Sequence, residues 1–472
     1  MISFILNRDL VQANVPKGTI LLDYIRDSKR LKGTKSACRE GDCGSCTVLV
    51  GSKKNNELQY KAITSCITPI GNINGKHVVT IEGLNQELAT PIQQALIDAG
   101  AIQCGYCTPG IVLSLTGYLL SSHVYHFDSA KEAIAGNICR CTGYKSIERA
   151  LETILTPLLS TDKKDRFAQL INKGYLPSWF SDIVERLSAI EIKSNVQDLK
   201  TIVGGGTDIY VQRPDELIDK ELSFFSDLTD LNQITFKENS CTIGAACKIS
   251  DILDNEILNQ NIPGFANHIR LIASNLIRNI ATIAGNIVNA SPIGDLSILF
   301  LAMNTTLIIK NTSGNIRKVK LDDFFKSYKN IDLQTYEYVA ELEFELPSKT
   351  ELFNFEKVSK RKYLDIASVN SAILVQMEHN LIKTIRVSVG GVSPIPLMLR
   401  KTCNYLIDKP LNTSVIQSAA EIMDQEISPI SDVRGSSDYK RLLARQLFFA
   451  HFIKLFPDKF ELSELIDKYL TK

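Results

Sequence analysis

Eight of the chain's 11 cysteines fall between Cys38 and Cys141, and this clustering constrains the fold more than any other feature of the sequence. The other three, Cys241, Cys247 and Cys403, have no partner at a ligand-like spacing, so we expect them to serve packing. A disulfide scaffold would require a secreted chain, but the first residues carry neither a basic leader nor a sustained apolar segment. We therefore expect a cytoplasmic protein whose dense thiols serve metal or redox chemistry.

Length and composition indicate a globular chain with more than one core. With 472 residues the chain is longer than a domain built around one hydrophobic core, and its length suggests about three domains. The 53 basic and 52 acidic residues give a net charge of +1, which offers no electrostatic case for binding nucleic acid or anionic lipid. No apolar run is long enough to span a bilayer. We expect neither nucleic acid nor a membrane among the partners of this protein.

The first cysteine group has the spacing C-x4-C-x2-C, with a fourth cysteine after 19 further residues: Cys38, Cys43, Cys46 and Cys66. This spacing is typical of a plant-type ferredoxin, in which four thiolates surround two irons and three of them come from one tight loop. Gly41 and Gly44 suit such a loop because they allow backbone angles that a Cβ resists. Zinc and buried free thiols are the alternatives, but zinc favours ligands paired as C-x2–4-C. The spacing therefore predicts a [2Fe–2S] cluster.

The second cysteine group combines a C-x2-C motif and a C-x-C motif separated by 31 residues: Cys104, Cys107, Cys139 and Cys141. Each motif lies between two predicted helices. Two loops at one end of a helical bundle are therefore expected to meet and supply two thiolates each. On ligand pattern alone, both a [2Fe–2S] cluster and zinc are possible for this group.

Hydrophobic periodicity and turn signals predict the following elements in the first third of the chain. Residues 1–88 are expected to be β-rich, with strands at 2–6, 47–50 and 77–81 and a helix at 19–26. Residues 89–160 are expected to form four helices, with start signals at Thr90-Pro91, at Thr108-Pro109 and at a capping box that begins at Ser129. A charged stretch then predicts a linker over residues 161–185.

Two stretches around the second cysteine group resemble the signature of the molybdenum hydroxylase family. They are QCGYCTPG, from Gln103 to Gly110, and GNICRCTGY, from Gly136 to Tyr144. Members of this family pair a plant-type ferredoxin domain with a helical [2Fe–2S] domain in this order, and all eight ligand positions are filled here. The resemblance implies two [2Fe–2S] clusters, a β-grasp ferredoxin fold for residues 1–88 and a four-helix iron–sulfur domain for residues 89–160.

A glycine run and a segment rich in small residues and amides mark the second half of the chain. Ile202 to Ile209, with the sequence IVGGGTDI, follows an apolar strand. Its glycines would let backbone N–H groups close on a pyrophosphate, although a simple turn is the plainer interpretation of the run alone. Arg278 to Asp295 places side-chain amides in an apolar setting, where either a polar ligand or satisfied turns of a helical core would supply their partners.

Both segments resemble the FAD-binding domain of the same family. The resemblance implies an α/β domain of the vanillyl-alcohol-oxidase and CO-dehydrogenase flavoprotein type over residues 186–350, and a C-terminal α+β flavoprotein subdomain over residues 351–472. The fold class expected for the whole chain is therefore multidomain α+β. The residues implied to bind the FAD diphosphate are Ile202, Val203, Gly204, Gly205, Gly206, Thr207, Asp208 and Ile209. The further FAD contacts implied are Ile272, Thr282, Asn286, Asp295 and Lys357.

Two of these positions carry specific expectations about the flavin ring. Ile272 matches a residue that packs near the isoalloxazine, where larger aromatic side chains also occur in the family. Lys357 matches a lysine near the flavin carbonyls, where a cation stabilises negative charge on the reduced ring. The alternative for Lys357 is a solvated lysine at a strand end.

The resemblance also implies a function and a partner. The family hydroxylates its substrates at molybdenum and passes electrons singly through the two clusters to FAD. The fused order of the three parts is similar to that of the small subunits of two-subunit purine dehydrogenases in the family, which implies NAD+ as the acceptor. Only Phe456 to Lys472 follow the last predicted helix, which we expect over Tyr439 to Leu455. We therefore expect the molybdopterin on a partner subunit and no residue of this chain acting on the hydroxylated substrate. By analogy with the family, the two subunits are expected to form a dimer of heterodimers.

Three other functions are compatible with the sequence. One is the small subunit of another family member, acting with an aldehyde or an aromatic N-heterocycle. Another is a free-standing iron–sulfur flavoprotein reductase. The third is a zinc-stapled scaffold with a degenerate flavin fold.

Overall fold

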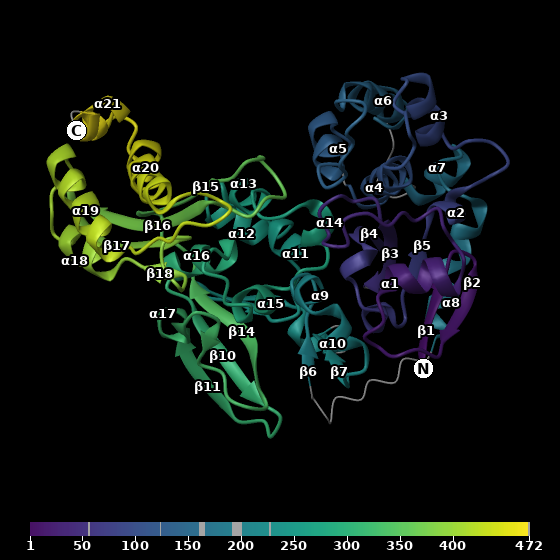
Figure 1. The fold of residues 1–472 in the computed structure, drawn as a ribbon, viewed down its shortest axis with the longest axis horizontal. Coiled ribbons are helices and arrows are strands. Elements are labelled where there is room, and N and C mark those ends of the chain that lie inside the picture. The colour runs from purple at the N-terminus through teal and green to yellow at the C-terminus, as the bar shows by residue number, and fades with distance from the viewer. Residues whose placement is uncertain (55–56, 123, 160–165, 191–200, 226–227, 471–472) are drawn as a thin grey trace. The chain divides into compact units, whose positions relative to one another are not determined.

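The computed structural model describes all of residues 1–472 except 55–56, 123, 160–165, 191–200, 226–227 and 471–472 (Figure 1). The chain divides into two compact units. Unit 1 consists of residues 1–227 and 274–281, and unit 2 consists of residues 228–273 and 282–472. Among the described residues, no helix is both long and apolar enough to cross a membrane.

The N-terminal part of unit 1 is a five-stranded sheet in the order β2-β1-β5-β3-β4. β1 pairs antiparallel with β2 and parallel with β5. The strands are β1 (Ile2–Leu6), β2 (Asp9–Ala13), β3 (Thr47–Lys54), β4 (Glu57–Thr64) and β5 (His77–Val79). The short helices are α1 (Leu21–Asp23), its π-helical continuation (Tyr24–Ser28) and α2 (Ile81–Leu84). The three predicted strands and the predicted first helix are confirmed, within a few residues at their ends.

Four helices follow, as the sequence predicts. They are α3 (Pro91–Asp98), α4 (Thr108–Ser121), α5 (Phe127–Ala133) and α6 (Lys145–Leu155). The hydroxyl of Thr90 accepts the backbone N–H of Gln93, and the Gln93 side chain accepts that of Thr90, which completes a capping box at the start of α3. α4 packs against β3 and β4, so the helices and the sheet share one apolar core.

The predicted start of α5 at Ser129 is wrong. The helix begins two residues earlier, at Phe127, and its N-cap residue His126 makes no side-chain cap bond. The reason is tertiary. The Tyr118 hydroxyl accepts the backbone N–H of His126 at 2.8 Å and donates to the His126 carbonyl at 3.0 Å. The Tyr118 side chain of α4 therefore bonds the backbone groups of the N-cap residue, so the helix can start there without a local capping box.

The stretch predicted as a linker, residues 161–185, is largely helical where it is described. It contains α7 (Arg166–Asn172), a 3-10 turn (Ser178–Asp182) and the start of α8 (Ile183–Ser188). Leu170 and Phe180 are buried in the core that α3 to α6 share with the sheet. Residues 160–165, the charged beginning of the predicted linker, lie outside the described residues. Apolar residues spaced for packing explain why this stretch folds against its neighbours.

His77 of β5 lies in an aromatic cluster that this stretch helps to form. Its ring is 5.6 Å from that of Trp179 and 5.7 Å from that of Phe180, centroid to centroid. The Tyr60 hydroxyl lies 2.5 Å from Nδ1, and Nε2 lies 2.9 Å from the carbonyl oxygen of Asn7. A neutral imidazole satisfies both contacts, because Nδ1 accepts and Nε2–H donates.

The buried imidazole predicts acid sensitivity of unit 1. Burial lowers the pKa of His77 from 6.5 to about 4. The unfolded chain takes up a proton as the pH falls through 6.5, whereas the folded protein does so only near pH 4. The stability from this site is therefore complete above pH 6.5 and is lost as the pH falls through that interval. We expect His77→Gln to lose less stability than the wild type between pH 7 and pH 5, in denaturant unfolding followed by Trp179, the chain's only tryptophan. Equal losses in the two proteins would contradict this assignment.

The remainder of unit 1 is a small β-α-β element and a short inserted helix. β6 (Thr201–Val203) and β7 (Leu222–Phe224) pair in parallel and are joined by α9 (Ile209–Gln212) and α10 (Pro214–Ile218). The inserted helix is α14 (Asn275–Arg278). Its Arg278, buried to 2% side-chain exposure, pairs with Glu132 of α5 at 2.9 Å. This ion pair ties the inserted segment to the helical part of the same unit.

Unit 2 contains two main sheets. The first has the order β11-β10-β14-β9-β8, and the second has the order β15-β16-β17-β18. The strands of the first sheet are β8 (Ile234–Lys237), β9 (Ser240–Gly244), β10 (Thr306–Asn311), β11 (Ile316–Lys320) and β14 (Glu337–Glu345). Those of the second are β15 (Glu351–Val358), β16 (Val369–Glu378), β17 (Leu381–Gly390) and β18 (Leu397–Met398). A small ribbon pairs β12 (Phe325–Ser327) with β13 (Asn330–Ile331).

Helices surround both sheets of unit 2. Those before the second sheet are α11 (Ile249–Leu253), α12 (Glu256–Asn261), α13 (Phe265–Arg270), α15 (Ile283–Val288), α16 (Asp295–Ala302) and α17 (Leu321–Phe324). Those after it are α18 (Arg400–Leu406), α19 (Thr413–Glu426), α20 (Ser437–Leu455) and α21 (Leu462–Leu470). α20, predicted from residue 439 to 455, packs against β15 and β16 (Figure 1).

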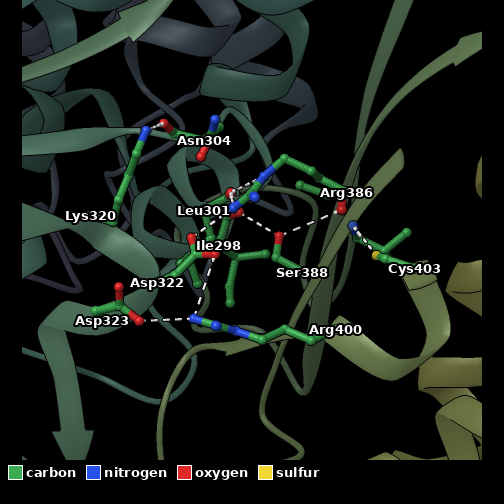
Figure 2. Close-up of polar contacts among 12 residues, drawn as sticks. Ile298, Leu301, Asn304, Lys320, Asp322, Asp323, Arg386, Ser388, Arg400 and Cys403 are labelled. Atoms are coloured by element: carbon green, nitrogen blue, oxygen red, sulfur yellow. Dashed lines mark hydrogen bonds and ion pairs between the residues drawn. The ribbon is translucent and has the colours of Figure 1, made fainter. Parts of the chain in front are cut away.

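A network of polar contacts joins α16 and α17 to β17 and α18 (Figure 2). The Arg386 guanidinium pairs with Asp322 at 2.6 Å and donates to the carbonyl of Leu301 at 2.9 Å. The Ser388 hydroxyl donates to the carbonyl of Ile298 at 2.6 Å. Two carbonyls of α16, one mid-helix and one in its last turn, thus receive partners from β17, which fixes this helix against the second sheet.

Candidate cluster and flavin sites

The first cysteine loop joins the π-helical turn to β3 and is shaped by left-handed residues. Arg39, Gly41 and Gly44 have φ angles of 60°, 80° and 66°. These turns fold the loop around Cys38, whose sulfur accepts the backbone N–H groups of Glu40 and Cys43, each at 3.4 Å. The expectation that the two glycines supply special backbone angles is confirmed. N–H groups directed at sulfur are the contacts that tune a cluster's potential.

The four thiols of the first group contact one another. Cys38 hydrogen-bonds with Cys43 and with Cys66, and Cys66 also hydrogen-bonds with Cys46. These bonds lower the pKa of Cys38 and Cys46 and raise the pKa of Cys43 and Cys66. Four sulfurs from a tight loop and a separate 3-10 turn (Ser65–Ile67) therefore converge on one place. That donor set fits a [2Fe–2S] cluster, which takes four thiolates.

The second group lies at the starts of two helices. Cys107 immediately precedes α4, and Cys139 and Cys141 precede α6. The sulfurs of Cys104 and Cys141 are 3.9 Å apart, and Cys107 hydrogen-bonds with Cys139. Burial and that bond raise the pKa of Cys107 to about 12. As predicted, each loop supplies two thiols, and each thiol contacts one from the other loop.

Paired thiols suit a binuclear cluster better than a single ion. In a [2Fe–2S] cluster the four thiolates are shared between two irons, two at each.

Asn137 connects the two cysteine groups, a role that the sequence did not predict. Its amide donates to the Gly44 carbonyl at 3.0 Å, and its oxygen accepts the Ser114 hydroxyl at 2.7 Å. Next to it, the backbone N–H of Ile138 donates to the carbonyl of Cys43 at 2.9 Å. The only sequence signal for this bridge is the position of Asn137, two residues before Cys139. The two cysteine loops are thus in direct backbone contact within unit 1.

The predicted diphosphate loop lies in unit 1 between β6 and α9. A Cβ on Gly205 would lie 2.2 Å from the carbonyl oxygen of Ile280, and Gly206 has a φ angle of 80°. The Asn72 amide donates to the Gly204 carbonyl at 3.1 Å. The glycines are therefore required by close backbone packing and by turn geometry. Their contact with a diphosphate stays a prediction.

Gly205→Ala tests that prediction. The new methyl group would force the loop away from Ile280, so we expect loss of FAD together with a lower free energy of unfolding. Gly244→Ala is a matched control, because its methyl would also lie 2.2 Å from a carbonyl oxygen, that of Leu231. Flavin absorbance and melting temperature should be measured for both variants. Retention of FAD by Gly205→Ala, or equal loss of FAD in both, would contradict the predicted role.

In unit 2 the structure brings three of the predicted flavin residues close together. The Lys357 ammonium of β15 pairs with the Asp295 carboxylate of α16 at 2.7 Å and donates to the carbonyl of Leu271 at 2.9 Å. Ile272, buried, is the next residue along the chain. The Lys357 side chain is only 2% exposed, so the alternative of a solvated strand-end lysine is wrong. The ion pair is therefore held inside unit 2, between β15 and α16.

The other two predicted residues belong to α15. The Thr282 hydroxyl accepts the backbone N–H of Gly285 at 3.2 Å, so this side chain caps the helix. The Asn286 side-chain oxygen is buried and has no hydrogen-bond partner among the described residues. Since buried amides need partners, this acceptor fits a site that takes a polar ligand. The predicted flavin residues are thus divided between unit 1, which holds Ile202 to Ile209, and unit 2, which holds the rest.

Four domain families match this chain in sequence. A 2Fe-2S iron-sulfur cluster binding domain matches residues 4–71, and a [2Fe-2S] binding domain matches residues 80–152. The FAD binding domain in molybdopterin dehydrogenase matches residues 178–348, and the CO dehydrogenase flavoprotein C-terminal domain matches residues 355–455. The chain belongs to the molybdenum hydroxylase family. Its cofactors are two [2Fe–2S] clusters and FAD, and its fold is the predicted multidomain α+β assembly.

Relatives within the family include xanthine dehydrogenases and aldehyde oxidases. Xanthine dehydrogenase 1 of Arabidopsis thaliana is 28% identical over 92% of this chain and 38% of its own length. Xanthine dehydrogenase of Emericella nidulans is 29% identical over 92% of this chain and 37% of its own length. Aldehyde oxidase 1 of Macaca fascicularis is 25% identical over 96% of this chain and 39% of its own length. The chain thus spans about two fifths of the curated relatives that it matches.

One solved structure shares the fold of about half of this chain. The structure is of carbon monoxide dehydrogenase from Hydrogenophaga pseudoflava, and its TM-score is 0.50 at 23% identity. The match covers 52% of this chain and 86% of that one. At this identity the likeness concerns the fold alone.

Proposed function

We propose that this chain is the iron–sulfur and FAD subunit of a xanthine dehydrogenase, which oxidises hypoxanthine and xanthine to urate. The observation that carries the proposal is the presence of two converging groups of four thiols and an FAD-binding domain in one chain. The similarity to xanthine dehydrogenases over 92% of the chain supports the choice of substrate.

In this proposal the cofactor residues are those named from the sequence. The first cluster is held by Cys38, Cys43, Cys46 and Cys66, and the second by Cys104, Cys107, Cys139 and Cys141. FAD is bound through Ile202 to Ile209 at its diphosphate and through Ile272, Thr282, Asn286, Asp295 and Lys357. When bound, the clusters supply one-electron transfer, and FAD supplies the exchange between single electrons and a hydride.

The residues of the chain do three things in this mechanism. The two cysteine loops, which would hold the clusters, are in direct contact, because the backbone N–H of Ile138 donates to the carbonyl of Cys43. Backbone N–H groups at Cys38 stabilise negative charge on sulfur. Lys357, which pairs with Asp295 at 2.7 Å, would place its ammonium where the reduced ring gains negative charge.

The partner and the acceptor are also part of the proposal. A second polypeptide holds molybdopterin and the purine site, and the two chains form a dimer of heterodimers in the cytoplasm. NAD+ takes up the hydride. Support for a molybdopterin-binding partner comes from relatives in the family, which are fused to or partnered with such a part.

A second candidate is the corresponding subunit of an aldehyde-oxidising enzyme. Aldehyde oxidases are 25% identical to this chain, and the xanthine dehydrogenases are 28% and 29% identical. Sequence identity therefore favours the first candidate only slightly over the second. The two candidates share every cofactor residue named above. They differ only in the substrate pocket of the partner and in the final acceptor.

The deciding experiment is an assay of the complex that co-purifies with this chain. Xanthine, an aldehyde and carbon monoxide should be compared as donors, each with NAD+ and with oxygen as acceptor. We expect xanthine-dependent NAD+ reduction by a complex that contains molybdenum. An aldehyde as the preferred donor would favour the second candidate. A fully active single chain without molybdenum would contradict both.

A further inference from the structure

Asn370 lies beside the Lys357–Asp295 pair and contacts it directly. This residue belongs to β16 and is fully buried. Its amide nitrogen donates to Oδ1 of Asp295 at 2.5 Å and to the carbonyl of Ile293 at 3.1 Å. The other carboxylate oxygen of Asp295 faces Lys357. The carboxylate is thus held from both sides, by an amide and by an ammonium.

This arrangement fixes the direction of the Lys357 ammonium. A lysine has three N–H donors. One is directed at Asp295 and one at the carbonyl of Leu271. Once both acceptors are fixed, the third donor has a defined direction. Asn370 fixes the first acceptor, because without the amide the Asp295 carboxylate could rotate about its own side-chain bonds.

The surroundings of Asn370 keep its amide in one orientation. Its side-chain oxygen is buried and has no hydrogen-bond partner among the described residues, so the amide retains an unsatisfied acceptor. Reversing the amide would direct that oxygen at the Asp295 carboxylate, where two acceptors would repel each other. A Cβ on Gly390 would lie 2.2 Å from the same oxygen, so only glycine leaves room for the observed placement.

We propose that Asn370 is a positioning residue for the flavin, acting through Asp295 to orient the Lys357 ammonium toward the reduced ring. This rests on the proposed contact of Lys357 with the flavin. Asn370 itself does not need to touch the ring. If Asn370 has this role, removing its amide changes the equilibrium between oxidised and reduced FAD, even though the Lys357 ammonium is still present.

The experiment compares the FAD midpoint potential in three forms of the flavin-loaded complex. They are the wild type, Asn370→Ala and Asn370→Asp. We expect Asn370→Ala to shift the equilibrium toward oxidised FAD about tenfold, or about 30 mV for a two-electron couple. Asn370→Asp sets a second carboxylate beside Asp295, and the pair is expected to share a proton. Its potential should therefore depend more steeply on pH than that of the wild type.

Asn354→Ala is the matched control. Asn354 is also a buried asparagine, on the adjacent strand β15, and its amide contacts Glu356 and His451 instead of Asp295. We expect this variant to lose stability while its flavin potential stays at the wild-type value. Gly390→Ala gives a further test, since its methyl presses on the oxygen of Asn370 and should shift the potential in the same direction as Asn370→Ala.

The outcomes separate this inference from the proposed function. A chemical titration of the flavin needs neither purine nor NAD+, so it can be read even if the complex does not oxidise xanthine. Wild-type potentials in Asn370→Ala and Asn370→Asp would overturn the positioning role. An equal shift in Asn354→Ala would overturn it as well, because the effect would then be one of general loosening.

Discussion

Cys66→Ser is expected to remove the first cluster and to leave the second in place. Cys66 is buried and hydrogen-bonds with both Cys38 and Cys46, so it holds the loop sulfurs together. A serine hydroxyl is a poor substitute for the thiolate that iron requires. We expect the iron content to fall from about four to about two atoms per chain. Flavin reduction through the complex should fall to background, because one step of the electron path is missing.

Iron and sulfide content, together with electron paramagnetic resonance of the reduced protein, measure this effect. Cys241→Ala is the control, since Cys241 is fully buried in β9 and belongs to neither cysteine group. The control should keep about four irons. Full iron content in Cys66→Ser would contradict its assignment as a ligand. Loss of both clusters would indicate that the two cysteine groups do not assemble separately.

Lys357→Met is expected to have the second largest effect. The substitution keeps the length of the side chain but leaves the Asp295 carboxylate, 11% exposed, without its cation. Removing one partner of a buried pair costs about 3–5 kcal/mol. We expect a lower melting temperature and a flavin equilibrium displaced toward the oxidised form, since the charge opposite the reduced ring is lost. Thermal unfolding and a redox titration of bound FAD measure the two consequences.

Lys440→Met separates the stability effect from the flavin effect. Lys440 makes the same kinds of contact as Lys357, although its partner Asp432 is 35% exposed. It pairs with Asp432 at 2.7 Å, donates to the carbonyl of Ile430 at 3.0 Å and is 3% exposed. We therefore expect a loss of stability in this control without a change of flavin potential. If both variants shift the potential equally, or if neither does, the proposed role of Lys357 is wrong.

The parts of the fold that could be predicted depend on local signals. The spacing of Cys38, Cys43 and Cys46 indicates a cluster loop because three ligands from one turn are a local arrangement. Thr90 begins α3 as predicted, since its capping box is complete within four residues. The second cysteine group could be assigned to a cluster only with the help of its neighbouring residues, because a C-x-C pair is compatible with zinc as well.

The parts that could not be predicted depend on tertiary contacts. α5 begins early because the Tyr118 hydroxyl holds His126. The expected linker is helical because Phe180 packs into a core built from distant segments. The burial of Lys357 depends on Asp295, which lies 62 residues earlier. Likewise, Asn370 has no sequence pattern that distinguishes it from any other asparagine in a strand.

The presence of two [2Fe–2S] clusters and one FAD in this chain is tested most directly by counting the electrons that the protein takes up. The purified protein should be reduced stepwise under anaerobic conditions, with absorbance and paramagnetic resonance recorded at each step. Each cluster takes one electron and FAD takes two, so we expect uptake of about four electrons per chain and two distinct cluster signals. Uptake of about two electrons, with zinc present in place of iron, would contradict it.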